Sequence, residues 1–239
     1  MGQVVLILAL AVAGCGRLGF DASVDGGSDD PSLIAHYACD DPGDGVLDET
    51  ATGGPATCAP GACPTRAPGI RGDACLFDGV DDMLVISHVP ALVTSQGVTA
   101  TAWIRAERIT TQQNIVGKPI GTFRNSWQLL TDDGGLVRIC ASLEGDAEGR
   151  CDATGPGHIA TNTWFHVAYS WDGARHRAWV DGAVVLDHPI VIGWDASPLL
   201  IGADIDTGVP VNPFQGAIDD VRIYDRALSS AELQRLAQP

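Results

Sequence analysis

The stretch from Thr163 to Gly182, T-W-F-H-V-A-Y-S-W-D-G-A-R-H-R-A-W-V-D-G, carries the strongest structural pattern in the sequence. Large apolar residues occupy every second position of its first half, at Phe165, Val167, Tyr169 and Trp171. A period of two is typical of a strand with one buried face. The Asp-Gly pairs at 172–173 and 181–182 favour tight turns, and the second pair lies between two strand-like runs. The stretch therefore predicts consecutive antiparallel strands.

Strand-like runs separated by turn residues continue on both sides of this stretch. Apolar residues again take alternate positions at Val98, Ala100, Ala102 and Ile104. A helical pattern is confined to the C-terminus, where Ser229 and Glu232 have the spacing of a capping box and are followed by apolar residues at helical intervals. Many strands without βαβ alternation predict an all-β fold, an antiparallel two-sheet jelly-roll sandwich with a short C-terminal helix.

Three blocks of the sequence resemble laminin-G-like and pentraxin-like domains of the concanavalin A-like lectin/glucanase superfamily. They are C-L-F-D-G-V-D-D-M-L-V-I at 75–86, the stretch at 163–182, and P-L-L-I-G at 198–202 followed by F-Q-G-A-I-D-D-V-R-I-Y-D-R-A-L-S-S-A-E-L at 214–233. The blocks follow the order of the family and span roughly residues 33–237. The resemblance implies a concanavalin A-like jelly roll. Such folds serve lectins, adhesion modules and hydrolases alike, so the fold leaves the ligand open.

The N-terminus is typical of an exported protein. The apolar run at 4–13 is too short to span a membrane, but it has the length of a signal-peptide core. The V-A-G-C sequence ending at Cys15 resembles a bacterial lipobox, which implies lipidation of Cys15. We therefore expect a lipoprotein signal peptide at 1–14, a flexible tether at 15–32 and one laminin-G-like domain at 33–239. The implied location is the bacterial cell envelope, with the outer membrane favoured, or the medium if the segment is a plain secretory signal.

Six further cysteines, an even number, favour a disulfide framework in an oxidising compartment. They are Cys39, Cys58, Cys63, Cys75, Cys140 and Cys151. A Pro-Gly turn between the second and third predicts the pair Cys58–Cys63. The pair Cys140–Cys151 would lie across a hairpin, which leaves Cys39–Cys75. Zinc binding is the alternative, but the sequence has no C-x-x-C pair and no Cys/His cluster.

The chain is strongly acidic, with a net charge of −16. Such a charge repels nucleic acid, which excludes that class of partner, and it is compatible with a divalent cation. The family resemblance implies a structural Ca²⁺ where the first strand meets the last, with Asp220 in the closing strand and Asp40, or as second choice Asp48, as its partner. The alternative is that these acids are solvated or paired with arginines.

Sugar binding on such a sandwich needs an exposed aromatic ring beside hydroxyl-binding side chains. Of the six tryptophans, most occupy strand positions and are expected in the core. Trp127 and Trp194 lie near loops, and Asn125 precedes the first of them. These three residues are the predicted ligand-binding set.

An acidic triplet at 143–151, L-E-G-D-A-E-G-R-C, places Glu144, Asp146 and Glu148 at alternate positions. It resembles the E-x-D-x-E strand of laminarinase-type hydrolases, in which a pair of carboxyl groups about 5 Å apart performs catalysis. The residues between the acids are small here, Gly145, Ala147 and Gly149, and glycine weakens a strand. With cysteines on both sides, the triplet is better interpreted as the tip of a disulfide-closed hairpin.

The sequence thus favours a non-catalytic, lipid-anchored envelope protein that binds carbohydrate or a cell-surface protein. One alternative is a glycoside hydrolase that uses Glu144 and Glu148. The other is a purely structural surface or adhesion protein. The oligomeric state and the identity of the ligand are open.

Overall fold

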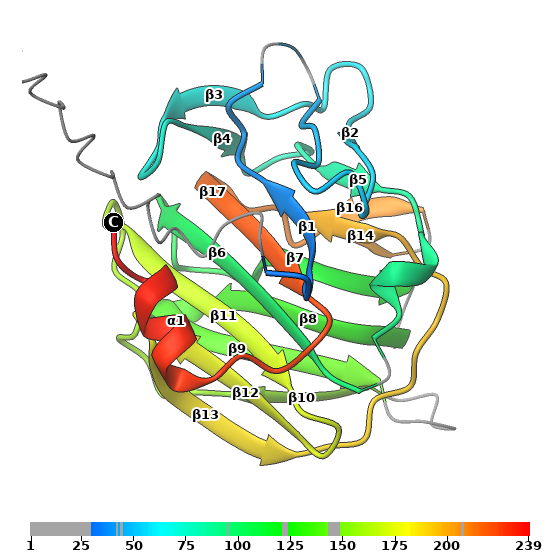
Figure 1. Cartoon of the computed structure of the whole chain (residues 1–239). Coiled ribbons are helices and arrows are strands. Elements are labelled where there is room, and N and C mark those ends of the chain that lie inside the picture. The colour runs from blue at the N-terminus through cyan, green and yellow to red at the C-terminus, as the bar shows by residue number, and fades with distance from the viewer. Residues whose placement is uncertain are drawn as a thin grey trace, which may run out of the picture.

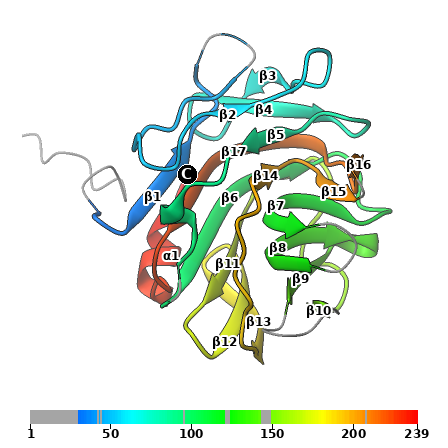
Figure 2. The same ribbon diagram turned by 90° about the vertical axis from the view of Figure 1, so that its right-hand side faces the viewer.

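The computed structural model describes residues 30–41, 43, 45–94, 96–120, 124–142, 149–206 and 208–239, and at 119, 120, 124 and 125 only the backbone. Two antiparallel sheets face one another as the layers of a sandwich (Figures 1 and 2). The predicted all-β jelly roll with a short C-terminal helix is confirmed.

The first sheet has the strand order β13-β12-β11-β6-β17-β4-β3, with β1 paired to the second half of β17. Its strands are β1 (Leu33–Tyr37), β3 (Thr65–Pro68), β4 (Asp73–Asp78), β6 (Val98–Ala106), β11 (Phe165–Trp171), β12 (Arg175–Val180), β13 (Ala183–Pro189) and β17 (Gln215–Tyr224). The stretch that opened the sequence analysis forms β11 and β12, and the Asp181-Gly182 turn leads into β13. Asp181 and Gly182 both have positive φ, as this type of tight turn requires.

The second sheet has the order β10-β9-β8-β7-β14-β5-β2. Its strands are β2 (Ala56–Thr57), β5 (Leu84–Ile86), β7 (Gln113–Ile120), β8 (Arg124–Asp132), β9 (Leu136–Ser142), β10 (Gly149–Ala153) and β14 (Leu199–Ile201). A separate ribbon of β15 (Asp204–Asp206) and β16 (Val209–Val211) and two 3-10 turns, η1 (Pro90–Leu92) and η2 (Asp133–Gly135), complete the described elements before the helix.

The core lies between the two sheets and is built from the alternating residues that the sequence predicted. Val167, Tyr169 and Trp171 of β11 point into it, as do the even-numbered residues of β6 from Val98 to Ala106. The other face of β6 is also largely buried, contrary to the half-buried strand predicted from its sequence. The reason is that the outer face of the first sheet is covered in part by other segments of the chain.

One cover is α1 (Ser230–Leu236), which packs on the outer face of the first sheet (Figure 2). Its apolar side contacts Ala168 and Trp179, and the predicted capping box joins Ser229 and Glu232. Arg226 donates to the same glutamate at 2.7 Å and to Asp30 at 2.8 Å. The first and last described segments are thereby fixed to one another.

The structure contains all three predicted disulfides: Cys39–Cys75, Cys58–Cys63 and Cys140–Cys151. In the third pair the two cysteines are direct cross-strand neighbours of β9 and β10, as the hairpin interpretation required. The acids Glu144, Asp146 and Glu148 between them lie outside the described residues, and so do Cys15 and the segment at 1–14. Among the residues that are described, no helix is long and apolar enough to cross a membrane.

Candidate functional site

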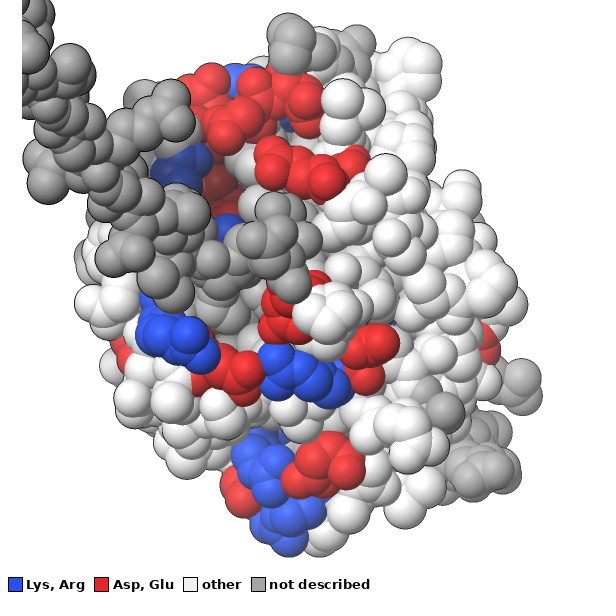
Figure 3. All heavy atoms as spheres, viewed as in Figure 1, with Lys and Arg blue, Asp and Glu red and all other residues white. Residues whose placement is uncertain are grey.

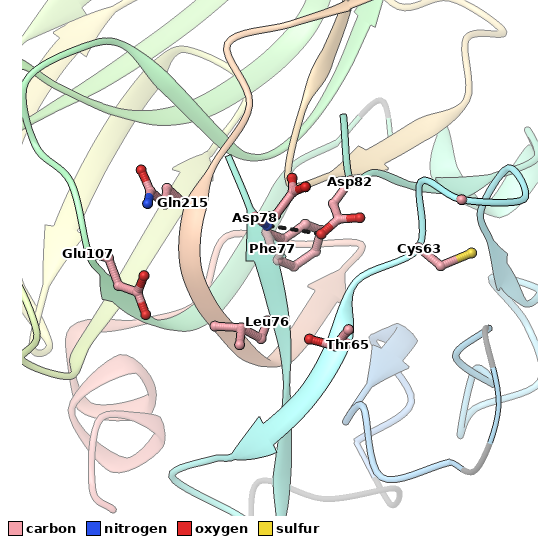
Figure 4. Close-up of a pocket in the computed structure, with 9 residues that line it drawn as sticks. Cys63, Thr65, Leu76, Phe77, Asp78, Asp82, Glu107 and Gln215 are labelled. Carbon is pink, nitrogen blue, oxygen red and sulfur yellow. Dashed lines mark hydrogen bonds between the residues drawn. The ribbon is translucent and has the colours of Figure 1, made fainter. Parts of the chain in front are cut away.

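A cavity of about 330 Å³ opens at the end of the first sheet where β4 finishes and β17 begins (Figure 4). The antiparallel register places Gln215 opposite Asp78, and β3 and β6 add the neighbouring side chains. The lining consists of Gly61, Cys63, Thr65, Leu76, Phe77, Asp78, Asp82, Glu107 and Gln215. Four chain segments that are distant in sequence therefore meet around one opening.

The acids on one side of the cavity belong to the D-G-V-D-D turn that follows β4. Asp78 accepts hydrogen bonds from the amides of Val80 and Asp81, and Asp82 accepts one from the amide of Asp78 at 2.9 Å. The carboxylates of Asp78, Asp81 and Asp82 each place an oxygen within 4.8 Å of the other two. The turn is thus held by its own carboxylates, which leave further oxygen lone pairs for a ligand.

The cavity has an uncompensated negative charge. Among the described residues, none of Asp78, Asp81, Asp82 and Glu107 forms an ion pair. Burial raises the pKa of Asp82, and the charges of Asp78 and Asp81 raise it further against the effect of the Asp78 amide. The chemistry of the opening is therefore that of hydrogen-bond acceptors, accompanied by the amide of Gln215 and the hydroxyl of Thr65.

The predicted sugar-binding tryptophans are not part of this cavity. Trp127 is 1% exposed and stacks on Tyr169 inside the core, with ring centroids 5.3 Å apart, so its ring offers no face to a sugar. That prediction fails because Trp127 occupies an inward position of β8. Trp194 is half-buried and packs against Trp171, and the side chain of Asn125 lies outside the described residues.

The predicted calcium ligands are separated into different hydrogen-bond systems. Asp48 accepts from the amides of His36 and Gly53, and Asp40 accepts from the amide of Asp73. Asp220 is occupied by cationic groups, as described next. The set as predicted does not fit a calcium ion, because at Asp220 a further cation would have to displace the side chains that already hold both carboxylate oxygens.

Asp220 is the centre of a buried charge network on β17. Its Oδ1 lies 2.6 Å from Nε2 of His36 and 3.0 Å from Nε of Arg222, and its Oδ2 accepts from Arg71 at 2.8 Å. Burial alone would raise the pKa of Asp220, but the hydrogen bond from His36 and the charges of Arg222 and Arg71 hold it below the usual value. The alternative interpretation, in which Asp220 pairs with an arginine, is therefore confirmed, with Arg222 as the partner.

The neighbouring Asp219 has no cationic partner in an ion pair among the described residues. Its Oδ2 accepts from the amides of Ile70 and Arg71, while its Oδ1 is buried without a hydrogen-bond partner. Burial raises the pKa of Asp219 to about 6.

On the α1 side of the molecule most basic side chains that are visible lie directly beside acidic ones (Figure 3).

Three residues near the cavity were missed from the sequence. Glu107 and Gln215 enter only through the strand register, for which the sequence has no local signal. Trp164 was among the tryptophans expected in the core, but it is half-buried, and the guanidinium of Arg105 lies 5.2 Å from its ring centroid. The position of Trp164 directly after the polar T-N-T segment was the signal that could have found it.

Comparison with solved structures shows the same architecture. Domain 4 of AbnA, a GH43 extracellular arabinanase from Geobacillus stearothermophilus solved with arabinotriose, is 22% identical with a TM-score of 0.66, over 87% of this chain and 98% of that one. The binding domain of Paraclostridial Mosquitocidal Protein 1 is 16% identical with a TM-score of 0.68, over 86% and 52%. Trypanosoma rangeli sialidase is 15% identical with a TM-score of 0.64, over 86% and 32%.

The chain thus spans about half of the structure that includes the mosquitocidal binding domain and about a third of the sialidase. No curated protein sequence matches the chain. The family model described as the concanavalin A-like lectin/glucanases superfamily matches residues 78–234, a range that includes the strands from β5 to β17 and most of α1. The chain therefore belongs to the concanavalin A-like lectin/glucanases superfamily.

Proposed function

We propose that this protein is a non-catalytic carbohydrate-binding module and that the cavity at the end of β4 and β17 is its binding site. The observation that supports this most directly is the set of ligand-facing groups: carboxylates without ion-pair partners, an amide and a hydroxyl, all set around one opening. Sugars are recognised by such groups because every sugar hydroxyl can donate to an acceptor.

The charge of the site defines the class of sugar. Carboxylates accept hydrogen bonds from hydroxyl groups but repel other carboxylates. The expected ligands are therefore neutral saccharides, and sugars with a carboxylate, such as sialic and uronic acids, are expected to bind poorly. The net charge of the chain, −16, acts in the same direction at longer range.

The comparison with domain 4 of AbnA adds support, because that domain was solved with arabinotriose and has a similar fold over nearly its whole length. We therefore include arabino-oligosaccharides among the neutral sugars to be tested. The identity of 22% supports the fold and leaves the position of the binding site to be established.

The position of the cavity is compatible with a lipid-anchored protein. The described chain enters the domain at β1, where Leu33 pairs with Tyr224 at the end of β17, whereas the cavity lies beside Gln215 at its start. Ten residues of strand separate the two points by about 30 Å. An anchor at Cys15 would therefore join the domain at one end of β17, with the cavity at the other. The three disulfides are typical of an exported protein.

The test is a glycan array with the purified protein, run with and without calcium. Retention of neutral glycans that Glu107→Gln weakens would support the proposal, and selective retention of acidic glycans would contradict it. Hydrolysis of any retained glycan would show that the protein is an enzyme and not a binding module. Loss of that hydrolysis in Glu144→Gln would identify the acidic triplet as the active site. If no glycan is retained but envelope extracts yield a specific protein partner, the structural role is favoured. Labelling with a radioactive fatty acid that Cys15→Ser abolishes would establish the lipid anchor.

A further inference from the structure

A row of side chains crosses the outer face of the first sheet beside the cavity. Arg105 pairs with Ala217, Ala217 pairs with Leu76, and Leu76 pairs with Thr65. The sequence neighbours of Arg105 and Leu76 are core residues, so these two side chains point to the opposite, outer face. Leu76 and Thr65 also line the cavity, so the row runs directly into it.

Trp164 extends this row by one more strand. Because Phe165 pairs with Ile104, the antiparallel register sets Trp164 beside Arg105, and Arg105 lies over one face of the indole ring. Phe165 packs against the core, so Trp164 points outward by the alternation of the strand. Three inter-strand spacings separate Trp164 from Leu76, a distance of about 14 Å.

The polar loop before Trp164 lies even closer to the cavity. The amide of Asn162 donates to the carbonyl of Ala106 at 2.7 Å, and the amide of the next residue, Glu107, donates to Gln215 at 2.9 Å. Asn162 and Glu107 are both exposed. An exposed asparagine and a partly exposed indole therefore stand next to the acidic wall of the cavity.

Resting on the proposed function, we infer that Asn162 and Trp164 form a second saccharide subsite, so that the protein binds a neutral oligosaccharide of at least two or three units. One unit occupies the acidic cavity, and a following unit packs its apolar ring face on Trp164 while Asn162 bonds its hydroxyls. Arg105 fixes the indole through its cation–π contact, which orders the ring before binding. A single sugar would engage only the cavity.

We expect the affinity to depend on the length of the oligosaccharide, and Trp164 to control this dependence. Gluco-, xylo-, arabino- and manno-oligosaccharides of one to four units would be titrated against the protein by calorimetry. For a series that binds, we expect the affinity to rise by roughly tenfold between one and three units, the scale of one aromatic contact. Trp164→Ala should abolish this rise and leave the affinity for the monosaccharide unchanged, whereas Trp164→Phe should keep most of it.

Two further variants separate this role from a structural one. Asn162→Gly is compatible with the positive φ of this position and should weaken trisaccharide binding without changing the melting temperature. Trp194→Phe, at the other half-buried tryptophan, should change nothing, and the change in tryptophan fluorescence on binding should vanish only in the Trp164 variants. Monosaccharides and trisaccharides that bind equally well would overturn this inference and leave the proposed function standing. Failure of all four series to bind would overturn both.

Discussion

Two groups of acidic residues lie along β17 and its neighbouring strands and have opposite surroundings. Asp220 is 5% exposed and is held by His36, Arg71 and Arg222. Asp78 and Glu107, beside Gln215 at the start of β17, are exposed and form no ion pair among the described residues. The first arrangement satisfies each charge within the protein, whereas the second leaves its acceptors directed to a cavity.

The difference teaches how to separate structural from ligand-binding acids in a chain as acidic as this one. A buried carboxylate either has a cationic partner, as Asp220 has, or its pKa is raised, as at Asp219, since an isolated buried charge is strongly unfavourable. An unpaired carboxylate at an opening has no charge partner within the protein, even where it accepts backbone hydrogen bonds as Asp78 does, and its charge is available to an outside molecule. The comparison therefore makes separate predictions for stability and for binding.

The largest effect on stability is expected from Asp220→Asn. The change removes the one negative charge that Arg71, Arg222 and His36 share, while asparagine tolerates the positive φ of this position. Leaving the buried guanidinium of Arg222 without this partner costs about 3–5 kcal/mol. Urea denaturation at pH 7 would measure the loss. A loss below about 1 kcal/mol, where exposed pairs lie, would show that the network is effectively solvent-exposed and would remove the contrast with the cavity.

The disulfides extend the comparison, because Cys39–Cys75 crosslinks β4 to the loop after β1 and Cys58–Cys63 lies at the cavity. The pairs are separated by 36 and 5 residues. Loop entropy predicts a loss of about 4 kcal/mol when the first is replaced by two alanines and about 2 kcal/mol for the second. Only the second replacement should also weaken sugar binding. Denaturation curves on the two double variants would measure the losses of stability, and calorimetry would measure the losses of sugar affinity. Equal losses of affinity would contradict the assignment of the cavity.

Asp219 provides a test by pH. Its folded pKa, about 6, lies above the ordinary value of 3.8, so the folded state prefers the neutral acid. The associated stability is present in full below pH 3.8 and is lost as the pH rises to about 6, a change of about 3 kcal/mol. Asp219→Asn removes this titration. The variant should therefore gain stability relative to the parent between pH 4 and pH 7, as measured by urea denaturation at both values. A constant difference between the two proteins over this range would contradict the raised pKa.

The sequence predicts the fold far better than the site, and the reasons are physical. The alternation in β11, the Asp-Gly turn after β12 and the three cysteine pairs are local signals or follow from them, and the structure contains each. Burial of Trp127 depends on the face of β8 to which it belongs, and its position near a loop gave the wrong answer.

The site depends on residues that only the sheet brings together. Thr65, Glu107 and Gln215 come from three separate parts of the chain and meet because β3, β6 and β17 are aligned in one register. Thr65 and Glu107 belong to no recognisable motif, and the family block that contains Gln215 predicts the closing strand but no cavity. Asp78 and Asp82 did lie in a block with family resemblance, but the sequence has no feature that distinguishes their unpaired state from the paired state of Asp220.

The smallest effect on stability, and the most specific one on binding, is expected from Glu107→Gln. Glu107 is exposed and unpaired among the described residues, so the change should alter the free energy of unfolding by less than about 0.5 kcal/mol. The neutral amide is a weaker acceptor than a carboxylate, and the affinity for neutral sugars should fall by about tenfold. Asp225→Asn, at an exposed acid away from the cavity, is the matched control and should change neither quantity. If both variants reduce binding alike, the effect comes from net charge, and the unpaired acids of the cavity are no more specific than any other acid on the surface.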